Sequence, residues 1–595
     1  MSQQNLVPLA TPLREHYDVV IVGAGIAGAL IAKRLADKGN HVLILEAGRS
    51  TSVTPDGYQS YVENFYTALG KSPNSPYPEN PNAPTSQTEI GPLPFGSNYV
   101  RAKGGTTMHF LGISLRMCPN DFRMKSLYGV GVDWPIGYDD LLDYYRQAEL
   151  AMGVSADVED QAYHGIHFPK GYVYPMHKVP LSYLDQVTSR SLNGMQFKFG
   201  QKTYDISLTS VPQARNSMPN PKYDGGKGYR PVGAAGDPER GKRCEGNSSC
   251  IPICPVQAKY SALKTLAAIP ASHCHILTQA VASQVMLDGN GRVSGVQYKV
   301  YQDESSGQHT VHTARGTIYV IAAHAIETPR LLLASPNVCR GSGELGRNLM
   351  DHPMPVAWGL MPQNIGACRG PATTSGVESL RDGEFRSRFA AFRMDYGNWG
   401  WEFATGSPYA DVTAAVAKGA FGKKLRDQLA SALPRQVFVD FLMEQLPDPG
   451  NTVTVNPQKV DPLGNMVPLI HYDIDEYTRT GFVNAFKFKD AFFKRLGMKD
   501  CTAGQPQFSA QVECDGQMFY YYGAGHVVGT HRMGSSASES VVNLKQRAWE
   551  HDNLYLAGCG NMRTIATSNP TLTMAALTLW AADNIQSDLE KRRRA

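Results

Sequence analysis

Residues 17–46 read YDVVIVGAGIAGALIAKRLADKGNHVLILE. The apolar run at 18–22 predicts a buried parallel strand, and 41–45 predicts a second one. The segment between them has the pattern of a helix that ends at Gly39, a residue type that commonly terminates helices. A complete strand–helix–strand unit within 30 residues is typical of an α/β fold built on a parallel sheet.

Glycines occur in this unit at the spacing of a dinucleotide-binding turn. Gly23 permits the tight turn, Gly25 lets the backbone approach a pyrophosphate, and Gly28 lets helix and strand pack closely. The start of the helix offers amide hydrogens and a positive dipole end to the phosphates. Glu46, after the second strand, can accept hydrogen bonds from an unphosphorylated ribose diol. The pattern predicts a dinucleotide site but does not separate NAD from FAD.

Composition excludes several classes of protein. The chain has 595 residues, 42% of them hydrophobic, and a net charge of +4, so it is expected to be globular with no electrostatic basis for binding nucleic acid. No apolar run reaches the roughly 18 residues of a membrane-spanning helix. The first residues show no basic region followed by an apolar one, so no signal peptide is expected in this sequence.

The chain is expected to contain two lobes. Residues 1–354 form the first part of the nucleotide-binding domain and include a cysteine-bearing loop at 240–262. Residues 355–515 have mixed strand and helix signals with few glycine motifs, and they predict a second, substrate-binding lobe. Residues 516–595 return to glycine-rich sequence and predict the C-terminal part of the first domain.

The last part of the chain carries candidate catalytic groups. Residues 525–534 read GHVVGTHRMG and place two histidines, His526 and His531, in one loop. Oxidation of an alcohol by hydride transfer needs a base for the hydroxyl proton, and histidine suits this role, but spacing does not choose between the two. Ser568 or Asn569 is expected to cap a helix whose positive end can stabilise a reduced flavin.

Three of the ten cysteines, Cys244, Cys250 and Cys254, lie within eleven residues, and Pro255 follows the last. Ten cysteines are too few for a disulfide scaffold in a chain of this length. A cysteine followed by proline is common in iron–sulfur loops, and three thiolates rather than four argue against structural zinc. Free buried cysteines, or one disulfide and one thiol, are the alternatives.

Taken together, these segments resemble the glucose–methanol–choline (GMC) oxidoreductase family of FAD enzymes. Further matches are GGTT at 104–107 and LMDHP at 349–353, whereas ETPRLL at 327–332 fits the family's second signature only loosely. The matches are spread over almost the whole chain. The resemblance implies an α/β fold with a discontinuous, Rossmann-like FAD-binding domain and a sheet-containing substrate-binding domain.

The resemblance also implies roles for individual residues. His526 is expected to be the base and Asn569 the partner of the substrate oxygen, with His531 in a supporting or structural role. His109 occupies the place where some relatives attach FAD covalently, and a noncovalent contact with the flavin ring is the alternative. The expected FAD-binding residues are Gly23, Gly25, Gly28, Glu46, Gly104, Gly105, Thr106, His109, Gly558, Pro570 and Thr571.

The cysteine spacing resembles one subgroup of the family, the bacterial membrane-associated sugar and sugar-acid dehydrogenases, and most of all their gluconate 2-dehydrogenase branch. By this resemblance Cys244, Cys250 and Cys254 hold a 3Fe-4S cluster, and electrons pass from FAD through it to a cytochrome or quinone. The expected partners are a small subunit that carries the export signal and a membrane cytochrome c subunit or quinone. The expected location is the periplasmic face of the inner membrane, with the cytoplasm as alternative.

Three other functions are compatible with the same residues. They are a cluster-free sugar oxidase, a sugar 3-dehydrogenase of the same family, and a noncatalytic nucleotide-binding scaffold. If the substrate is an acid, an arginine of the second lobe can clamp its carboxylate, and the candidates are Arg381, Arg386 and Arg388.

Overall fold

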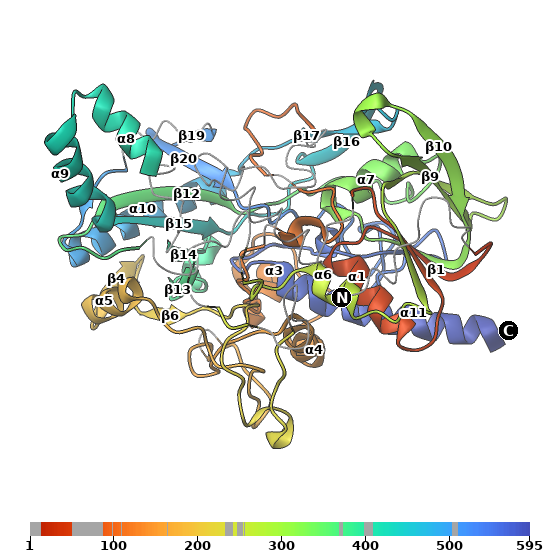
Figure 1. Ribbon diagram of the computed structural model, residues 1–595, viewed down its shortest axis with the longest axis horizontal. Helices are drawn as coiled ribbons and strands as arrows, with labels where there is room; N and C mark the ends of the chain where they lie inside the picture. Colours follow the sequence, from red (N-terminus) through yellow and green to blue (C-terminus); the bar gives the residue numbers. More distant parts are fainter. Residues whose placement is uncertain are drawn as a thin grey trace.

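The computed structural model has the expected mixed α/β architecture (Figure 1). It describes residues 14–49, 87–97, 99–108, 110–162, 165–232, 242–244, 246, 254, 256–367, 373–397, 408–502 and 510–594. Everything said below about the structure concerns these residues.

The nucleotide-binding part is built on a five-stranded parallel sheet. Its strand order is β21 (Leu554–Leu556), β11 (Gly316–Ile321), β1 (Tyr17–Val22), β2 (Val42–Leu45) and β7 (Cys274–Leu277). The strands are short apolar runs because helices and loops cover both faces of such a sheet. β21 comes from the C-terminal segment and joins a sheet that β1 begins, so the domain is discontinuous in sequence, as predicted.

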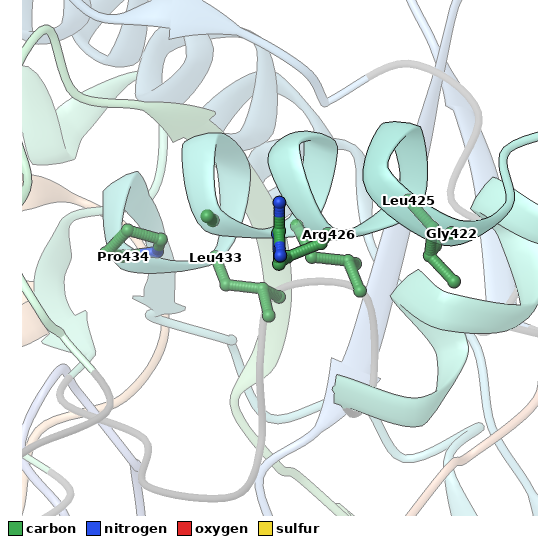
Figure 2. Close-up of a pocket in the computed structure, with 7 residues that line it drawn as sticks. Gly422, Leu425, Arg426, Leu433 and Pro434 are labelled. Carbon is green, nitrogen blue, oxygen red and sulfur yellow. The ribbon is translucent and has the colours of Figure 1, made fainter.

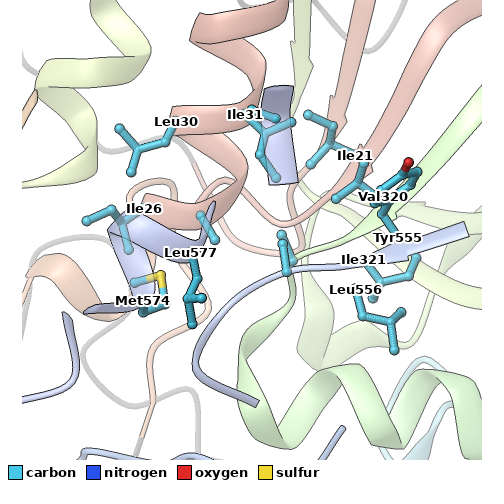
Figure 3. Packing of buried hydrophobic residues seen from close by; sticks show 14 of the residues in the cluster. Ile21, Ile26, Leu30, Ile31, Val320, Ile321, Tyr555, Leu556, Met574 and Leu577 are labelled. Atoms are coloured by element: carbon cyan, nitrogen blue, oxygen red, sulfur yellow. The ribbon is translucent and has the colours of Figure 1, made fainter. Parts of the chain in front are cut away.

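Two helices, α1 (Ile26–Ala36) and α11 (Thr571–Arg594), pack together beside this sheet. Figure 3 shows Ile26 and Leu30 of α1 near Met574 and Leu577 of α11, with strand residues next to them. Burying a side chain of this size contributes about 1.5–3 kcal/mol. An ion pair of 2.8 Å also joins the two helices, from Arg34 in the last turn of α1 to Asp583 in the middle of α11.

The second lobe is built on an eight-stranded sheet. Along its main path lie β19 (Ala510–Cys514), β20 (Gln517–Gly523), β12 (Pro353–Leu360), β15 (Gln436–Met443), β14 (Phe392–Gly397), β13 (Thr373–Val377) and β6 (Leu208–Ser210), and β18 (Lys499–Asp500) pairs with β12. Neighbouring strands are antiparallel. The predicted lobe boundaries stay predictions, but this sheet also contains β6 and β20, which lie outside 355–515.

One face of this sheet packs on the long helix α10 (Glu476–Leu496). Phe392 and Tyr396 of β14 and Phe441 of β15 contact aromatic side chains of α10. Because side chains alternate between the two faces of a strand, Arg393 and Asp395 of β14 point away from α10. The charged face of β14 is therefore opposite the aromatic one, and it faces the first domain through a contact described below.

The other helices and strands surround these two sheets. They are β3 (Thr88–Glu89), α3 (Met124–Tyr128), α4 (Leu142–Met152), α5 (Tyr183–Leu192), β4 (Gln196–Phe199), β5 (Lys202–Asp205), α6 (Ala262–Ala267), β8 (Ala280–Leu287), β9 (Val293–Tyr301), β10 (His309–Ala314), α7 (His324–Ala334), α8 (Pro408–Ala417), α9 (Gly422–Ala432), β16 (Thr452–Val460) and β17 (Met466–His471). Among the described helices, none combines the length and the apolar character that crossing a bilayer requires.

Helices α8 and α9 lie at the edge of the second lobe (Figure 1). A shallow hollow on α9 is lined mainly by apolar side chains, among them Leu425, Leu429 and Leu433, with Arg426 beside them (Figure 2). None of the residues expected in the active site lines this hollow.

Candidate active site

The three glycines of the first turn have different surroundings. Gly23 has φ +102, and a Cβ there would lie 2.5 Å from the carbonyl oxygen of Ala322. A Cβ on Gly28 would collide with the carbonyl oxygen of Gly23, whereas a Cβ on Gly25 would meet nothing within 4 Å. Packing alone explains the first and third glycines. The space in front of Gly25 is a cradle that a bound dinucleotide can fill.

Glu46 lies at the end of β2, where the sequence predicts a ribose partner. Its Oε2 accepts a hydrogen bond of 2.8 Å from the amide of Ala24, and its Oε1 accepts one of 2.7 Å from Gly48. Burial raises the pKa of Glu46, and these two bonds oppose that shift. A carboxylate has about four acceptor positions. Glu46 is thus held beside the glycine turn with acceptor capacity left for ribose hydroxyls.

The second glycine pair lies against the first turn. Gly104 and Gly105 both have positive φ, and a Cβ on Gly105 would lie 3.1 Å from the Cα of Gly25. A short 3₁₀ helix from Gly105 to Met108 follows, and Thr106 accepts a hydrogen bond from a preceding amide at 3.4 Å. His109 lies outside the described residues, so its covalent bond to FAD stays a prediction. The structure therefore brings the two glycine motifs together, as one cofactor would require.

The start of α11 lies near the third set of expected cofactor contacts. Gly558 has φ +117 and open space where a Cβ would be, and Pro570 and Thr571 form the beginning of the helix. The two side chains expected to cap this helix bond elsewhere: Ser568 donates to the carbonyl of Arg116, and Asn569 contacts other side chains. The helix start is thus left for a ligand with negative or polar character.

Two histidines and one asparagine form a chain of hydrogen bonds at this helix start. His526 Nε2 lies 3.3 Å from Asn569 Nδ2, and His526 Nδ1 lies 2.8 Å from His352 Nδ1. His352 Nε2 lies 3.0 Å from the carbonyl oxygen of Ala566. A carbonyl only accepts, so His352 carries its proton on Nε2 and accepts at Nδ1. His526 then carries its proton on Nδ1, and its Nε2 is the unprotonated nitrogen that a base needs.

Both histidines are neutral at physiological pH. Burial lowers the pKa of His526 to about 3, with a further contribution from the positive charge of Arg393. Burial also lowers the pKa of His352 well below its ordinary value, helped by the neighbouring His526. The pair therefore rests in the form that accepts a proton.

The histidine chain is anchored by residues to which sequence analysis assigned no role. Asp351 Oδ1 accepts hydrogen bonds from the amides of His526 (2.9 Å) and His352 (2.7 Å), and Ser97 donates to the other carboxylate oxygen. Asp351 and His352 belong to the LMDHP segment, which was matched to the family as a motif only. In the sequence, the indication of Asp351 and His352 is an acidic residue next to a histidine. Only the fold shows that this pair contacts His526.

The other histidine of the loop has a separate environment. His531 is buried, and its Nδ1 lies 2.7 Å from Asn561 Oδ1. Burial lowers its pKa to about 4. Its described hydrogen bond is to Asn561, away from Asn569. This placement agrees with a supporting position, which stays a prediction.

The arginines proposed as carboxylate clamps have other partners. Arg386 is fully buried and forms ion pairs with Asp121 (2.9 Å) and Asp382 (3.0 Å), while Arg381 donates to Ser568 and to the backbone. Arg388 is exposed. The arginine that reaches the histidine–asparagine pair is Arg393, with Nη1 3.3 Å from Asn569 Oδ1, and sequence analysis did not name it.

The cysteine loop is only partly described. Cys250 and Pro255 lie outside the described residues, and among the described ones no three His, Cys, Asp or Glu side chains are arranged to hold a metal. The described residues that follow Cys254 contact residues 104–108, which contain the second glycine pair. Lys259 Nζ donates to the carbonyl of Met108 (3.1 Å), and the amide of Ala262 donates to Thr107 Oγ1 (2.9 Å). The segment that follows Cys254 is therefore attached to residues 104–108.

Comparisons with known proteins show which families and proteins this chain resembles. The family models described as GMC oxidoreductase match residues 228–354 and 447–578, and a model of NAD(P)-binding Rossmann-like domains matches 21–62. Among curated proteins, the fructose dehydrogenase large subunit of Gluconobacter japonicus is 32% identical, over 96% of this chain and 98% of that protein. The gluconate 2-dehydrogenase flavoprotein of Pantoea cypripedii is 22% identical, over 98% and 96%.

Solved structures show the same fold at lower identity. Pyridoxine 4-oxidase from Mesorbium loti has a TM-score of 0.60 and 18% identity, over 96% of this chain and 99% of that one. Formate oxidase has a TM-score of 0.63 and 15% identity, over 96% and 98%. These likenesses extend across both lobes.

Proposed function

The chain belongs to the GMC oxidoreductase family, and from this we propose that it is the flavoprotein subunit of a sugar or sugar-acid dehydrogenase that passes electrons through an iron–sulfur cluster. It is an FAD-dependent oxidoreductase that acts on CH–OH groups. The catalytic part of the proposal depends chiefly on one observation, the unprotonated Nε2 of His526 opposite Asn569 at the start of α11.

This geometry supports a division of labour between the two residues. FAD, when bound, supplies the acceptor for the hydride that leaves the alcohol carbon. His526 Nε2 removes the hydroxyl proton, and Asn569 Nδ2 donates a hydrogen bond to the substrate oxygen. The Nδ1 proton of His526 points to His352 and holds the ring in this orientation during proton transfer.

The glycine cradle fits FAD on grounds of space and of hydrogen bonding. The open position before Gly25, the acceptor capacity of Glu46 and the open position at Gly558 are what an extended dinucleotide needs. Covalent attachment through His109 is part of the proposal. A yellow, fluorescent band after acid precipitation and denaturing electrophoresis is the expected result, and quantitative release of FAD would contradict it.

The cluster proposal has two supports. Cys244, Cys250 and Cys254 have a spacing that suits three thiolate ligands, and the residues after Cys254 are bonded to the loop that carries Gly104 and Gly105. A cluster held there would accept electrons singly, which favours a dehydrogenase with a protein or quinone acceptor over an oxidase. The names of two relatives support an assembly of several subunits: one is the large subunit of fructose dehydrogenase, and the other is the flavoprotein of gluconate 2-dehydrogenase.

The proposal includes partner subunits and a location. We propose a small subunit with the export signal, a membrane cytochrome c subunit or quinone as acceptor, and a position at the periplasmic face of the inner membrane. Co-expression of this chain with a small subunit that carries an export signal, followed by cell fractionation, tests this proposal. Retention of the pair in the cytoplasm would contradict it.

The first experiment is an anaerobic visible spectrum with iron and sulfide analysis, before and after addition of D-fructose or D-gluconate. Flavin bleaching with about three irons per chain supports the proposal. Flavin without iron contradicts the cluster and favours a sugar oxidase, which rapid oxygen consumption would identify. A 3-keto product would instead identify a sugar 3-dehydrogenase, and cofactor binding without bleaching by any alcohol would leave a noncatalytic scaffold.

Variants of the cysteines refine this experiment. Cys250→Ser is expected to lose iron and electron transfer to cytochrome c while sugar still bleaches the flavin, because the hydride step does not need the cluster. Cys274→Ser is the matched control, since Cys274 is buried in β7 of the parallel sheet, and it is expected to keep its iron. Retention of iron in Cys250→Ser would remove that residue from the ligand set.

A further inference from the structure

The last residues before α11 are held by two arginines of the second lobe. Arg381 donates from Nε to Thr567 Oγ1 at 3.2 Å and from Nη2 to Ser568 Oγ. Arg393 donates from Nη1 to Asn569 Oδ1 at 3.3 Å. Both arginines are fully buried. Three consecutive residues therefore each accept a hydrogen bond from a buried guanidinium group, and the last of the three is the expected partner of the substrate oxygen.

The two arginines share one carboxylate. Glu378, which directly follows β13, lies 3.6 Å from Arg381 Nε. It also accepts a hydrogen bond of 2.9 Å from Arg393 Nε and forms an ion pair of 2.8 Å with Arg393 Nη2. Asp395 pairs with the same Nη2. Because a guanidinium group is planar and rigid, holding Nε and Nη2 also fixes the position of Nη1, which is the atom that donates to Asn569.

The contact with Arg393 decides which way the amide of Asn569 points. A guanidinium group only donates hydrogen bonds, so it must face the amide oxygen, and the NH₂ group is then turned to His526. His526 presents its unprotonated Nε2 to that NH₂ group at 3.3 Å, which requires the same orientation. An amide turned by 180° would place donor against donor at Arg393 and oxygen against the lone pair of Nε2. Both hydrogen bonds would be lost.

The backbone leaves room for the guanidinium group of Arg393 at Gly376. This glycine of β13 pairs with Asp395, and a Cβ there would lie 3.0 Å from Arg393 Nη2 and 2.6 Å from Glu378 Oε1. A larger residue would displace both side chains without removing a charge. Position 376 is therefore a place from which the contact between Arg393 and Asn569 can be disturbed indirectly.

We propose that Arg393, held by Glu378 and Asp395, is a positioning residue that keeps the amide of Asn569 turned so that Nδ2 faces His526 and the substrate oxygen. This inference rests on the proposed function and adds a residue to its catalytic arrangement. Arg393 is 0% exposed, so it acts through Asn569 rather than by touching the substrate. The second lobe thus takes part in the reaction by orienting a side chain that belongs to the C-terminal segment.

The test is a double-mutant cycle in the purified holoenzyme. Anaerobic flavin bleaching is followed with the most active of D-fructose, D-sorbitol and D-gluconate, because single turnovers stay measurable in slow variants. Arg393→Lys keeps the positive charge but not the planar fork, and it should lower the limiting rate about tenfold with the half-saturating substrate concentration changed less than about threefold. Asn569→Ala should lower the rate about 10²–10³-fold. In the Asn569→Ala protein, adding Arg393→Lys should change the rate less than about twofold.

Arg116→Lys is the matched control. Arg116 is also a buried arginine paired with a carboxylate, since its Nε and Nη2 donate to the two oxygens of Glu149 at 2.7 and 2.9 Å. This variant is expected to lower Tm and to leave the bleaching rate within about twofold of the wild type. Gly376→Ala is a second test variant that keeps every charge, and its loss of rate should also disappear in the Asn569→Ala protein. Tm and FAD content are measured for each protein.

Each outcome decides the inference. If Arg393→Lys lowers the rate by the same factor with and without the Asn569 amide, its effect is a general structural one, and the inference is overturned while the proposed function stands. An unchanged rate in Arg393→Lys has the same meaning. If Arg393→Lys does not fold, the same comparison with Gly376→Ala decides. If none of the three substrates bleaches the wild-type flavin, the proposed function fails and the inference fails with it.

Discussion

At the scale of single residues, the protonation state of His526 depends on one carbonyl oxygen. Ala566 accepts from His352 Nε2, which makes His352 an acceptor at Nδ1 and places the proton of His526 on Nδ1. The base is thus oriented by two hydrogen bonds, neither of which involves the substrate. Choosing His526 over His531 from the sequence depended on family resemblance, because the GHVVGTHRMG loop treats the two alike.

We predict that His526→Asn abolishes catalysis without abolishing cofactor binding. The asparagine amide can replace Nδ1 as donor to His352, but it supplies no base where Nε2 was. Loss of a general base costs about 10²–10⁴-fold in rate. The expected result is a loss of kcat in this range with full FAD content, measured by steady-state kinetics and flavin absorbance.

The control for this prediction is His531→Asn, which keeps a donor for Asn561 Oδ1. It is expected to retain kcat within a few-fold. If His526→Asn kept near-normal turnover, or if His531→Asn lost as much, the base assignment would be wrong.

At the scale of elements, two glycines of the turn between β1 and α1 are needed for different reasons, one for packing and the other for ligand binding. Position 28 needs a glycine because α1 passes close to the carbonyl oxygen of Gly23, where a Cβ would collide. At Gly25, in contrast, a Cβ would meet nothing within 4 Å. The GxGxxG pattern predicts a role for each position from local strand–turn–helix geometry; the structure shows the close packing at Gly28, and the cofactor contact at Gly25 stays a prediction.

We predict opposite effects for two substitutions in this turn. Gly25→Val should fold, because its Cβ meets nothing within 4 Å, but should lose FAD because the side chain occupies the cradle. Gly28→Ala should misfold or fall in stability by about 1–3 kcal/mol, as overpacked cores do. Circular dichroism, Tm and bound flavin measured on both variants test this. Normal FAD content in Gly25→Val would show that the cofactor does not pass Gly25.

The start of α11 shows the limit of local rules. Ser568 and Asn569 precede Pro570 as a capping pattern requires, yet both side chains bond to other segments, Ser568 to the carbonyl of Arg116 and Asn569 to Arg393 and His526. A cap pattern in sequence indicates where a helix begins, and tertiary partners decide where the polar side chain points.

At the scale of the whole molecule, the active site is assembled from both lobes. His352 precedes β12, Arg393 lies on β14, His526 follows β20, and Asn569 precedes α11. Several histidines are buried in this assembly, and burial lowers the pKa of each of the following: His324, His352, His526 and His531. The folded protein therefore binds fewer protons at these sites than the unfolded chain does.

This difference predicts how stability depends on pH. A histidine whose pKa is lower in the folded protein than in the unfolded chain leaves the free energy of unfolding at its full value above the unfolded pKa of about 6.5. As the pH falls below that value, the unfolded chain takes up the proton and the folded protein does not, so the free energy of unfolding decreases. Each such histidine contributes a loss of about 1.4 kcal/mol per pH unit until its folded pKa is reached, which is about 3 for His526. We expect Tm to fall between pH 6.5 and 4.

The variant His526→Asn isolates one of these contributions. The free energy of unfolding of this variant should decrease less over this pH range than that of the wild type. The difference corresponds to one proton, which is about 1.4 kcal/mol per pH unit. Thermal unfolding of both proteins at several pH values measures the difference. Parallel Tm curves would mean that His526 is protonated in the folded state at pH 4 to 6.5.

The sequence by itself determined the α/β class, the glycine turn with Glu46 and the return of the C-terminal segment to the first domain. These depend on period, apolar runs and turn residues, which act over a few positions. The covalent bond to FAD and the cluster ligands stay predictions, and His109 and Cys250 lie outside the described residues. The carboxylate clamps expected from the sequence, Arg381, Arg386 and Arg388, stay predictions, and Arg393, which reaches Asn569, was not among them.

Only the tertiary structure decided which polar groups meet. His352 and Arg393 lie far from His526 and Asn569 in sequence, and no local pattern distinguishes them from other buried polar residues. The packing of the two lobes brought Arg393 to Asn569. Local geometry specifies elements, but contacts between distant segments depend on how whole sheets and helices pack, and that is where the chemistry of this site was set.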